Sequence, residues 1–385
     1  MMYPFRPFIA LLVAILLVSA SHTLTYAEDV TVSDCDFESF QSAIATANTD
    51  GSVITFDCEE IITFTDDVII TGDVTIIGGV LDGGGDTQFF TIYPNASLTL
   101  DAVTIQNGYS EDDKDSPIIV YNRGTLTITN STFSDNVAVG LGGVIYNDGT
   151  VDITESTFSN NSAQSGGVIY NFNNGILTIT DSTFSENSAV SIGGAIANIN
   201  TLTITDSTFS ENSAQSGGAI VNGGTMDIAT STFTDNSAQF GGAITNIGTL
   251  TSTNNQFSTN TAESGGAIIN AEDAIADIST NTFTDNSADY GGAITNIGTL
   301  TSTESQFSTN TATISGGAIA NIGTLTSTES QFTDNTAEES GGAIYNEGVV
   351  TSTDSQYENN TCDGTVPITD DGGNTATDAE GCVSE

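Results

Sequence analysis

Positively charged residues are almost absent from this sequence. Its 385 residues include three Lys and Arg and one His, against 49 Asp and Glu, so the formal net charge is −46 at pH 7. Such a field repels phosphate backbones and anionic lipid surfaces, and we therefore expect neither nucleic acid nor a membrane as a partner. Charged residues still make up only 14% of the chain, so the acids are not dense. The composition favours solubility in salty or cation-rich surroundings, with loose calcium binding as the alternative, and it predicts no cofactor.

Histidine is too scarce for several kinds of catalytic site. His22 is the only His, and it lies in a segment that we expect to be removed, which excludes nucleophilic triads. Zinc ligands would have to come from the four cysteines near the chain ends. A glycosidase needs only two carboxylates at a suitable separation, and the many acids leave that alternative open. Acids such as Asp135, Glu186, Glu211 and Asp235 occupy turn positions, where solvation is the commoner reason for an acid, so we expect no enzymatic activity.

Long apolar runs are also rare, and the one that stands out is at the N-terminus. Arg6 precedes the apolar stretch 8–18, and residues 25–27 form a small-residue cleavage site, a pattern typical of a secretory signal peptide at 1–27. The stretch is too short to span a bilayer. The sequence therefore predicts an exported protein, extracellular or at the cell surface.

The few cysteines fall into two pairs near the chain ends, Cys35 with Cys58 and Cys362 with Cys382. Four cysteines allow three pairings. In an exported protein structural disulfides are the expected state, and local pairing would tie down each terminus.

What the sequence does contain is one repeat written many times. A second mark of the repeat, an aromatic residue followed three positions later by Asn, occurs ten times, from Phe133 and Asn136 to Tyr357 and Asn360. Ten marks indicate ten coils of about 24–25 residues. The first mark, a Gly-Gly pair, recurs at steps of 24 to 27 residues and begins at Gly142, Gly166, Gly193, Gly217, Gly241, Gly265, Gly291, Gly316 and Gly341.

Within one repeat, apolar residues alternate with polar ones. Leu202 and Ile204 alternate with threonines in residues 201–205, as expected of a strand with one buried face. Gly-Gly and Asn suit the corners because both tolerate positive φ. A coil of this length has room for three short strands and three turns. Stacking in register predicts an all-β parallel β-helix, a solenoid in which each coil buries its apolar residues against its neighbours.

Register converts the columns of the repeat into ladders along the axis. We expect the Phe and Ile columns to stack inside the solenoid. The Asn that follows each GGAI-type segment is predicted to form an amide ladder at a turn, each side chain hydrogen-bonding to the next. This column contains Asn147, Asn171, Asn198, Asn222, Asn246, Asn270, Asn296, Asn321 and Asn346.

A further pattern divides the coils into two types. Six coils carry Ile and Thr four residues apart, as in Ile204 and Thr208, whereas four carry Ser and Gln there, as in Ser252 and Gln256. One interpretation is a compensated pair, in which the Gln amide satisfies a buried Ser hydroxyl. The other is descent by duplication, because residues 241–262 and 291–312 differ at two positions.

The N-terminal end differs from the regular array. Residues 38–48 place Phe40, Ala43, Ile44 and Ala47 on one helical face. We expect a short helix there that covers the open end of the first coil, since an uncovered end is an unpaired sheet edge.

These patterns divide the chain into five segments. They are the signal peptide at 1–27, the cap helix and first coils at 28–110, an acidic loop at 111–117, the regular repeats at 118–360 and a disulfide-tied tail at 361–385.

The two repeat marks carry a family resemblance. GGA(I/V) and FxxN, as in residues 217–220 with 233–236, resemble the repeats of the chlamydial polymorphic outer-membrane proteins and related bacterial surface β-helix proteins, over about residues 131–360. The segments 40–56 and 362–382 look like the cap and the ending of secreted bacterial proteins of the pectin-lyase-like superfamily. The resemblance implies a right-handed parallel β-helix at the cell surface or secreted.

The same resemblance bears on activity. The chlamydial proteins end in an outer-membrane barrel, and nothing after Tyr357 could supply one, so we do not expect membrane insertion. Lyases of the pectin-lyase-like fold use an Arg or Lys base beside calcium, and only Lys114 and Arg123 could serve here. We therefore expect a non-catalytic adhesion protein or structural spacer, with cell-surface glycans or matrix as partners. The alternative is a polysaccharide-acting glycosidase on this fold.

Outward-facing threonines support another hypothesis. They would form parallel columns spaced about 4.8 Å along the axis and roughly 7 Å along each strand, regular enough to order water as ice-binding solenoids do. The simpler explanation is that Thr suits any exposed strand. Asp152, Asp227 and Asp277 interrupt the middle column. Its candidate binding residues are Thr127, Thr178, Thr203, Thr251, Thr301 and Thr326.

Overall fold

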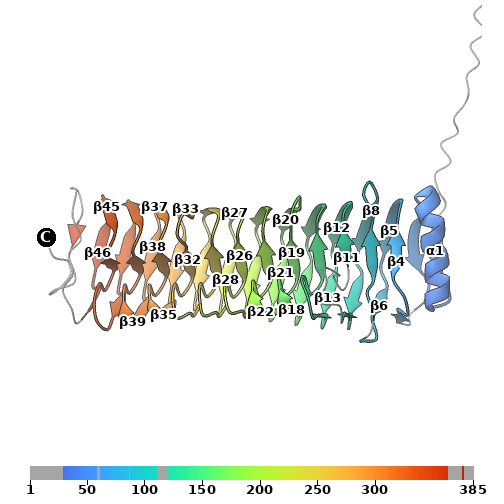
Figure 1. Ribbon diagram of the computed structural model, residues 1–385, viewed down its shortest axis with the longest axis horizontal. Helices are drawn as coiled ribbons and strands as arrows, with labels where there is room; N and C mark the ends of the chain where they lie inside the picture. Colours follow the sequence, from blue (N-terminus) through green and yellow to red (C-terminus); the bar gives the residue numbers. More distant parts are fainter. Residues whose placement is uncertain (1–28, 59–60, 86, 111–119, 363–374, 377–385) are drawn as a thin grey trace, which may run out of the picture.

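A computed structural model describes residues 29–58, 61–85, 87–110, 120–362 and 375–376. The predicted signal peptide 1–27, the acidic loop 111–117 and Cys382 lie outside the described residues. The chain forms a rod of stacked coils with one helix, α1 (Phe37–Asp50), across the N-terminal end (Figure 1). The predicted all-β fold is confirmed as a right-handed parallel β-solenoid of about 13 turns. At about 4.8 Å per coil, the stack is roughly 60 Å long.

Three long parallel sheets, A, B and C, run the length of the rod, and shorter strands form a fourth, sheet D. Sheet A contains β1 (Val30–Val32), β2 (Val53–Phe56), β5 (Asp73–Ile77), β8 (Ser97–Asp101), β12 (Thr125–Thr129), β16 (Thr150–Thr154), β20 (Ile176–Thr180), β24 (Thr201–Thr205), β27 (Thr225–Ala229), β30 (Thr249–Thr253), β33 (Ile275–Ser279), β37 (Thr299–Thr303), β41 (Thr324–Thr328) and β45 (Val349–Thr353). Sheet B contains β3 (Ile62–Thr63), β6 (Val80–Asp82), β9 (Thr104–Gln106), β13 (Thr132–Ser134), β17 (Thr157–Ser159), β21 (Thr183–Ser185), β25 (Thr208–Ser210), β28 (Thr232–Thr234), β31 (Gln256–Ser258), β34 (Thr282–Thr284), β38 (Gln306–Ser308), β42 (Gln331–Thr333), β46 (Gln356–Glu358) and β47 (Thr375–Ala376).

Sheet C contains β4 (Val68–Ile70), β7 (Phe90–Ile92), β11 (Val120–Asn122), β15 (Ile145–Asn147), β19 (Ile169–Asn171), β23 (Ile196–Asn198), β26 (Ile220–Asn222), β29 (Ile244–Asn246), β32 (Ile268–Asn270), β36 (Ile294–Asn296), β40 (Ile319–Asn321) and β44 (Ile344–Asn346). Sheet D has two parts, which contain β10 (Tyr109–Ser110), β14 (Val137–Ala138), β18 (Ser162–Ser165) and β22 (Ser188–Ile192), and β35 (Ser287–Tyr290), β39 (Thr311–Ser315) and β43 (Thr336–Ala337).

Helix α1 closes the N-terminal end of the stack. The side chain of Asp36 caps it by accepting a hydrogen bond from the Ser39 backbone at 2.7 Å, and Gly51 ends it with φ of 73°. Its apolar face, which includes Phe40 and Ile44, is buried on the first coils. The predicted helix is confirmed, and the Cys35–Cys58 disulfide links the chain on either side of it.

The core is built from columns of identical residues. The ring column from Phe133 to Tyr357 on sheet B is fully buried, with neighbouring ring centroids 4.7–4.9 Å apart and ring planes within 10° of parallel. This spacing is the strand spacing of the sheets. Each ring therefore packs against the same ring of the coils above and below.

Two columns of buried Asn side chains lie at the corners of the coils. In the column that runs from Asn122 through Asn147 to Asn346, each Nδ2 donates to Oδ1 of the next coil at 2.7–2.9 Å. The Asn of the FxxN mark forms another ladder, in which Nδ2 of Asn212 donates to Oδ1 of Asn236 and to the Phe184 carbonyl, both at 3.0 Å. The sequence analysis used this second column only as a mark of the repeat.

The corners on either side of sheet B are left-handed turns. One residue at each corner has positive φ, as at Asp206, Glu304 and Thr309, with φ of 51–54°. Asn, Asp and Gly accept this conformation more readily than Glu or the β-branched Thr. Most of the described coils therefore hold a residue that is strained at a corner.

The interpretation of Ser and Gln as a compensated pair is wrong. Ser252 is buried, but Gln256 is exposed, because the left-handed residue Asn254 between them shifts the alternation so that Phe257 faces inward instead. The buried hydroxyls pair with a neighbouring polar column. Asn255 Nδ2 donates to Ser252 Oγ at 2.9 Å, and the other pairs are Ser302 with Ser330, Ser327 with Ser355 and Ser352 with the Tyr357 hydroxyl, at 2.8–3.3 Å.

The Asn ladder predicts the effect of breaking it. Asn246→Leu removes the acceptor for Asn222 and the donor to Asn270 and to the Ile275 carbonyl, so buried polar groups lose their partners. We expect the free energy of unfolding to fall by about 3 kcal/mol, measured by urea denaturation followed by far-ultraviolet circular dichroism. The same substitution at the exposed Asn174 should change it by less than about 0.5 kcal/mol. Equal effects at both sites would contradict a structural role for the ladder.

The corner conformation predicts a stabilising change. Thr309→Asn replaces a strained β-branched residue at φ of 54° with a residue that fits, as Asn160 and Asn359 already do in this column. We expect a gain of about 0.5–1 kcal/mol, seen as a higher melting temperature. Thr301→Asn in a strand of the same coil is the matched control and should give no gain; a similar rise for both variants would refute the explanation.

Candidate binding surfaces

The outer face of sheet A carries the predicted threonine columns. Thr127 pairs in register with Asp152, and the same column continues through Thr178, Thr203, Asp227, Thr251, Asp277, Thr301 and Thr326. The six candidate threonines thus lie in one line along the rod. The three aspartates sit in that line and place carboxylates between them.

The threonine face is also uneven. Ala229 stands in the column that holds Thr205 and Thr253 in the adjacent coils, and a shallow hollow of about 140 Å³ opens there beside Asp227 and Thr251. Ile176 and Ile275 replace Thr at the other edge of the face. The lattice of hydroxyl groups is therefore regular over only a few coils at a time.

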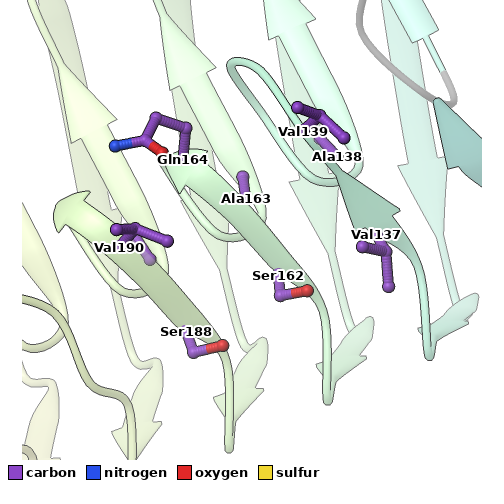
Figure 2. Close-up of a pocket in the computed structure, with 9 residues that line it drawn as sticks. Val137, Ala138, Val139, Ser162, Ala163, Gln164, Ser188 and Val190 are labelled. Atoms are coloured by element: carbon purple, nitrogen blue, oxygen red, sulfur yellow. The ribbon is translucent and has the colours of Figure 1, made fainter. Parts of the chain in front are cut away.

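A second hollow lies on sheet D. Strands β14, β18 and β22 line a space of about 510 Å³, and Figure 2 shows Val137 and Val139 on one side of it, with Val190 on the other. Val190 is 70% exposed. The lining contains only Val, Ala, Ser and Gln side chains, so this hollow offers apolar contact and no ionisable group.

A third surface, which the sequence analysis missed, is a groove along sheet C. Its floor lies in the outward-facing column of that sheet, which holds Tyr from Tyr121 to Tyr170 and again at Tyr345, with Ala, Val, Thr and Ile between them. The middle floor residues are only 0–8% exposed although they point away from the core, because the flanking columns stand over them. The floor column contains Tyr121, Tyr146, Tyr170, Ala197, Val221, Thr245, Ile269, Thr295, Ala320 and Tyr345.

The two walls of this sheet C groove alternate between large and small residues. One wall is the residue before each Gly-Gly pair, and it reads Ile192, Ser216, Phe240, Ser264, Tyr290 and Ser315 in successive coils. The other wall is the residue after each ladder Asn, and it reads Ile199, Gly223, Ile247, Ala271, Ile297 and Ile322. Large residues of both walls fall in the same coil three times, at Ile192, Phe240 and Tyr290, and they form three ridges, separated by notches, with a period of two coils. The pattern ends after the third ridge, where Ile322 stands opposite the small Ser315.

Hydrogen bonds between the wall and the floor fix the side chains that form the notches. The Ser216 hydroxyl in a notch donates to Thr245 Oγ1 on the floor at 3.0 Å, and Thr245 donates in turn to the Phe240 carbonyl at 2.8 Å. Two coils further on, Ser264, Thr295 and the Tyr290 carbonyl repeat the arrangement at 3.1 and 2.8 Å. The ridge rings are nevertheless accessible, since Phe240 is 40% and Tyr290 is 45% exposed.

The groove opens into a hollow toward its C-terminal end. This hollow measures about 460 Å³ and is lined by Tyr290, Ile314 and Ile322 together with the carboxylates of Glu339 and Glu347. The Tyr345 hydroxyl, also at the hollow, donates a hydrogen bond to Glu347 Oε1. That bond, with burial and the carboxylate charge, raises the pKa of Tyr345, so its phenol is protonated at neutral pH.

The residues that the sequence analysis considered for catalysis lie at separate places in the described part of the chain. Arg123 and Lys114 were the two residues considered as a lyase base. The Cζ atom of Arg123 lies over the Tyr121 ring, 5.9 Å from its centroid, and Lys114 lies outside the described residues. The turn acids Asp135, Glu186 and Glu211 sit at left-handed corners. In the part of the chain that the structure describes, no three His, Cys, Asp or Glu side chains are grouped to hold a metal ion.

The predicted disulfide is confirmed at the N-terminal end. Cys35 and Cys58 are joined, with their Cα atoms 5.8 Å apart. Cys362 is disulfide-bonded as well, while its predicted partner Cys382 falls in the part of the chain that is not described.

Comparison with known proteins agrees with the solenoid. A family model described as the right-handed beta helix region matches residues 88–262. The chlamydial polymorphic membrane protein repeat matches residues 329–347. No curated protein and no solved structure matches the chain. Across the described ranges, no helix has the length and apolar character needed to cross a membrane.

Proposed function

We propose that this right-handed parallel β-helix protein, whose repeats are of the polymorphic membrane protein type, is a non-catalytic binding protein of the cell surface or extracellular space. The observation that carries the proposal is the sheet C groove, where large apolar side chains stand exposed in a fixed order along the rod. Exposed apolar patches of this kind mark interaction sites. The interior is filled by side-chain stacking, so the outer columns are the part of the repeat that is free to recognise a partner.

The groove gives the adhesion hypothesis a defined surface. Its ridges combine aromatic and aliphatic side chains with the half-buried wall hydroxyls of Ser216 and Ser264, a mixture that suits glycans or matrix proteins. The strongly acidic chain favours partners that are neutral or basic.

Binding by residues 28–385 to a broad glycan array and to whole cells tests the proposal, with and without calcium, and with release of reducing sugar followed in parallel. The double variant Phe240→Ser/Tyr290→Ser flattens the ridges with the residue that this column already carries in other coils. We expect it to weaken binding at least tenfold, because the apolar contact area is lost.

The matched control removes apolar surface elsewhere. Val139→Ser/Val190→Ser alters the sheet D hollow and should leave binding unchanged. If only the control variant loses binding, the binding site lies on sheet D. Release of reducing sugar would favour the glycosidase alternative. Absence of binding to every glycan and cell would refute adhesion in this form.

The register of sheet A supports a second candidate function, ordering of water at ice. The threonines pair directly across coils, as at Thr301 and Thr326, so their hydroxyl groups repeat along the axis at the strand spacing.

Ice-crystal shaping measures this second function. Thr251→Tyr/Thr301→Tyr places two bulky groups in the middle column, so a shaping activity carried by this face should be lost. The sheet C double variant should shape ice as the original chain does. Failure of the unaltered protein to shape ice would eliminate the candidate.

A further inference from the structure

The ridges of the sheet C groove repeat at a distance that suits one type of ligand. Two coils span about 9.6 Å along the axis. A polyproline II helix has three residues per turn at about 3.1 Å each, so it repeats every 9.3 Å or so. A polyproline II segment lying along the rod therefore meets the three ridges at Ile192, Phe240 and Tyr290 at successive turns, and its fourth turn lies at the hollow beyond them.

We propose that the sheet C groove binds a proline-rich segment of a partner protein in the polyproline II conformation, with a basic residue placed at the C-terminal hollow. This inference rests on the proposed function, since it names the partner of the same surface. It commits to a protein ligand, and a glycan in the groove is an outcome of the test.

The ridges and notches provide the apolar contacts. Ridge coils pair a ring or Ile on one wall with Ile on the other, as in Phe240 with Ile247 and Tyr290 with Ile297. The notch between these ridges is bordered by Ser264 and Ala271 and has Ile269 as its floor. Aromatic-lined grooves recognise polyproline II segments by packing proline rings between such ridges. Because the conformation exists before binding, little entropy is lost when it is held.

The charges at the C-terminal hollow supply the basic specificity. Glu339 and Glu347 both line the hollow, and no Lys or Arg lies among its lining residues. The nearest aromatic faces, Tyr290 and Tyr345, are placed for cation–π contact with a bound Arg or Lys. The field of the whole chain draws such a ligand in and opposes an acidic one.

The length of the groove sets the length of the ligand. From the coil of Ile192 to the coil of Ser340 there are six coil steps, or about 29 Å. A polyproline II chain covers this distance with about nine residues. A probe of roughly that length is therefore the shortest one that contacts every ridge and the hollow.

Isothermal titration of residues 28–385 with synthetic peptides tests the inference. The probe is a blocked peptide of three Pro-Pro-Leu units with an arginine at each end, so that either chain direction presents a basic residue to the hollow. One control peptide has every Pro replaced by Gly, and another has both arginines replaced by Glu. We expect the probe to bind at least tenfold more tightly than either control.

Variants of the protein locate the binding. Ser264→Tyr fills the central notch with a residue that the wall already carries in the next coil, and we expect at least tenfold weaker binding. Glu339→Gln/Glu347→Gln should weaken the probe about fivefold. Asp227→Asn/Asp277→Asn on sheet A removes the same number of charges away from the groove and should have little effect. Circular dichroism confirms that each variant remains folded.

The outcomes separate this inference from the function on which it rests. Equal binding of the Gly and Pro peptides, or equal effects of the two charge variants, would overturn it. A different result would also overturn it: cellohexaose binds, Ser264→Tyr abolishes that binding, and the peptide does not bind. This result would assign the groove to a glycan, and the proposed surface-binding function would still stand. If cells bind but neither groove variant changes that binding, the groove itself is refuted as the site.

Discussion

In-register stacking is the constraint on which the rest of this structure depends. Every residue of a coil lies about 4.8 Å from its equivalent in the next coil, so an inward position must be occupied by a side chain that packs well against a copy of itself. Phe satisfies the condition by parallel stacking, as between Phe283 and Phe307 with ring planes 3° apart. Asn satisfies it because one amide is both donor and acceptor. The buried Asn column is therefore polar and yet fully bonded, from Asn122 onward.

The same constraint leaves the outward columns free to vary. A change at an outward position alters the surface of one coil without disturbing the contacts inside it. The walls of the sheet C groove use this freedom, because Ser264 and Tyr290 occupy one column in adjacent coils while the Ile268 and Ile294 side chains beneath them remain alike. The ridges and notches of the groove are thus a pattern of surface side chains on a uniform interior. The ligand contacts can therefore differ from coil to coil while the fold stays the same.

The sequence predicts the interior well and the surface poorly for this reason. Alternation and spacing are enough to place Phe133 inside, to place the helix across the first coil and to pair Cys35 with Cys58, because each depends on a local pattern or on chain ends. The Ser252 and Gln256 interpretation failed because a single left-handed residue, Asn254, reverses which side of the strand faces inward. The groove escaped notice because its walls and floor come from three columns, each unremarkable alone. Only the folded coil brings Phe240, Thr245 and Ile247 to one edge.

Stacking also accounts for the many acids that stand at the left-handed corners beside sheet B. The nearest neighbour of an acid along a column is the residue at the same position in the next coil. Like charges such as Glu186 and Glu211 therefore face each other across one coil spacing. Repulsion at this distance is tolerable where both side chains extend into water, and the left-handed corners direct them outward. Uncharged residues such as Asn160 and Thr259 interrupt the runs of acids in that column. The result is a rod whose acidic corners flank sheet B, while its apolar groove lies on sheet C. A ligand for that groove therefore needs an apolar body to fill the notches and gains from a positive charge on approach, and these are the two properties that a basic, proline-rich segment combines.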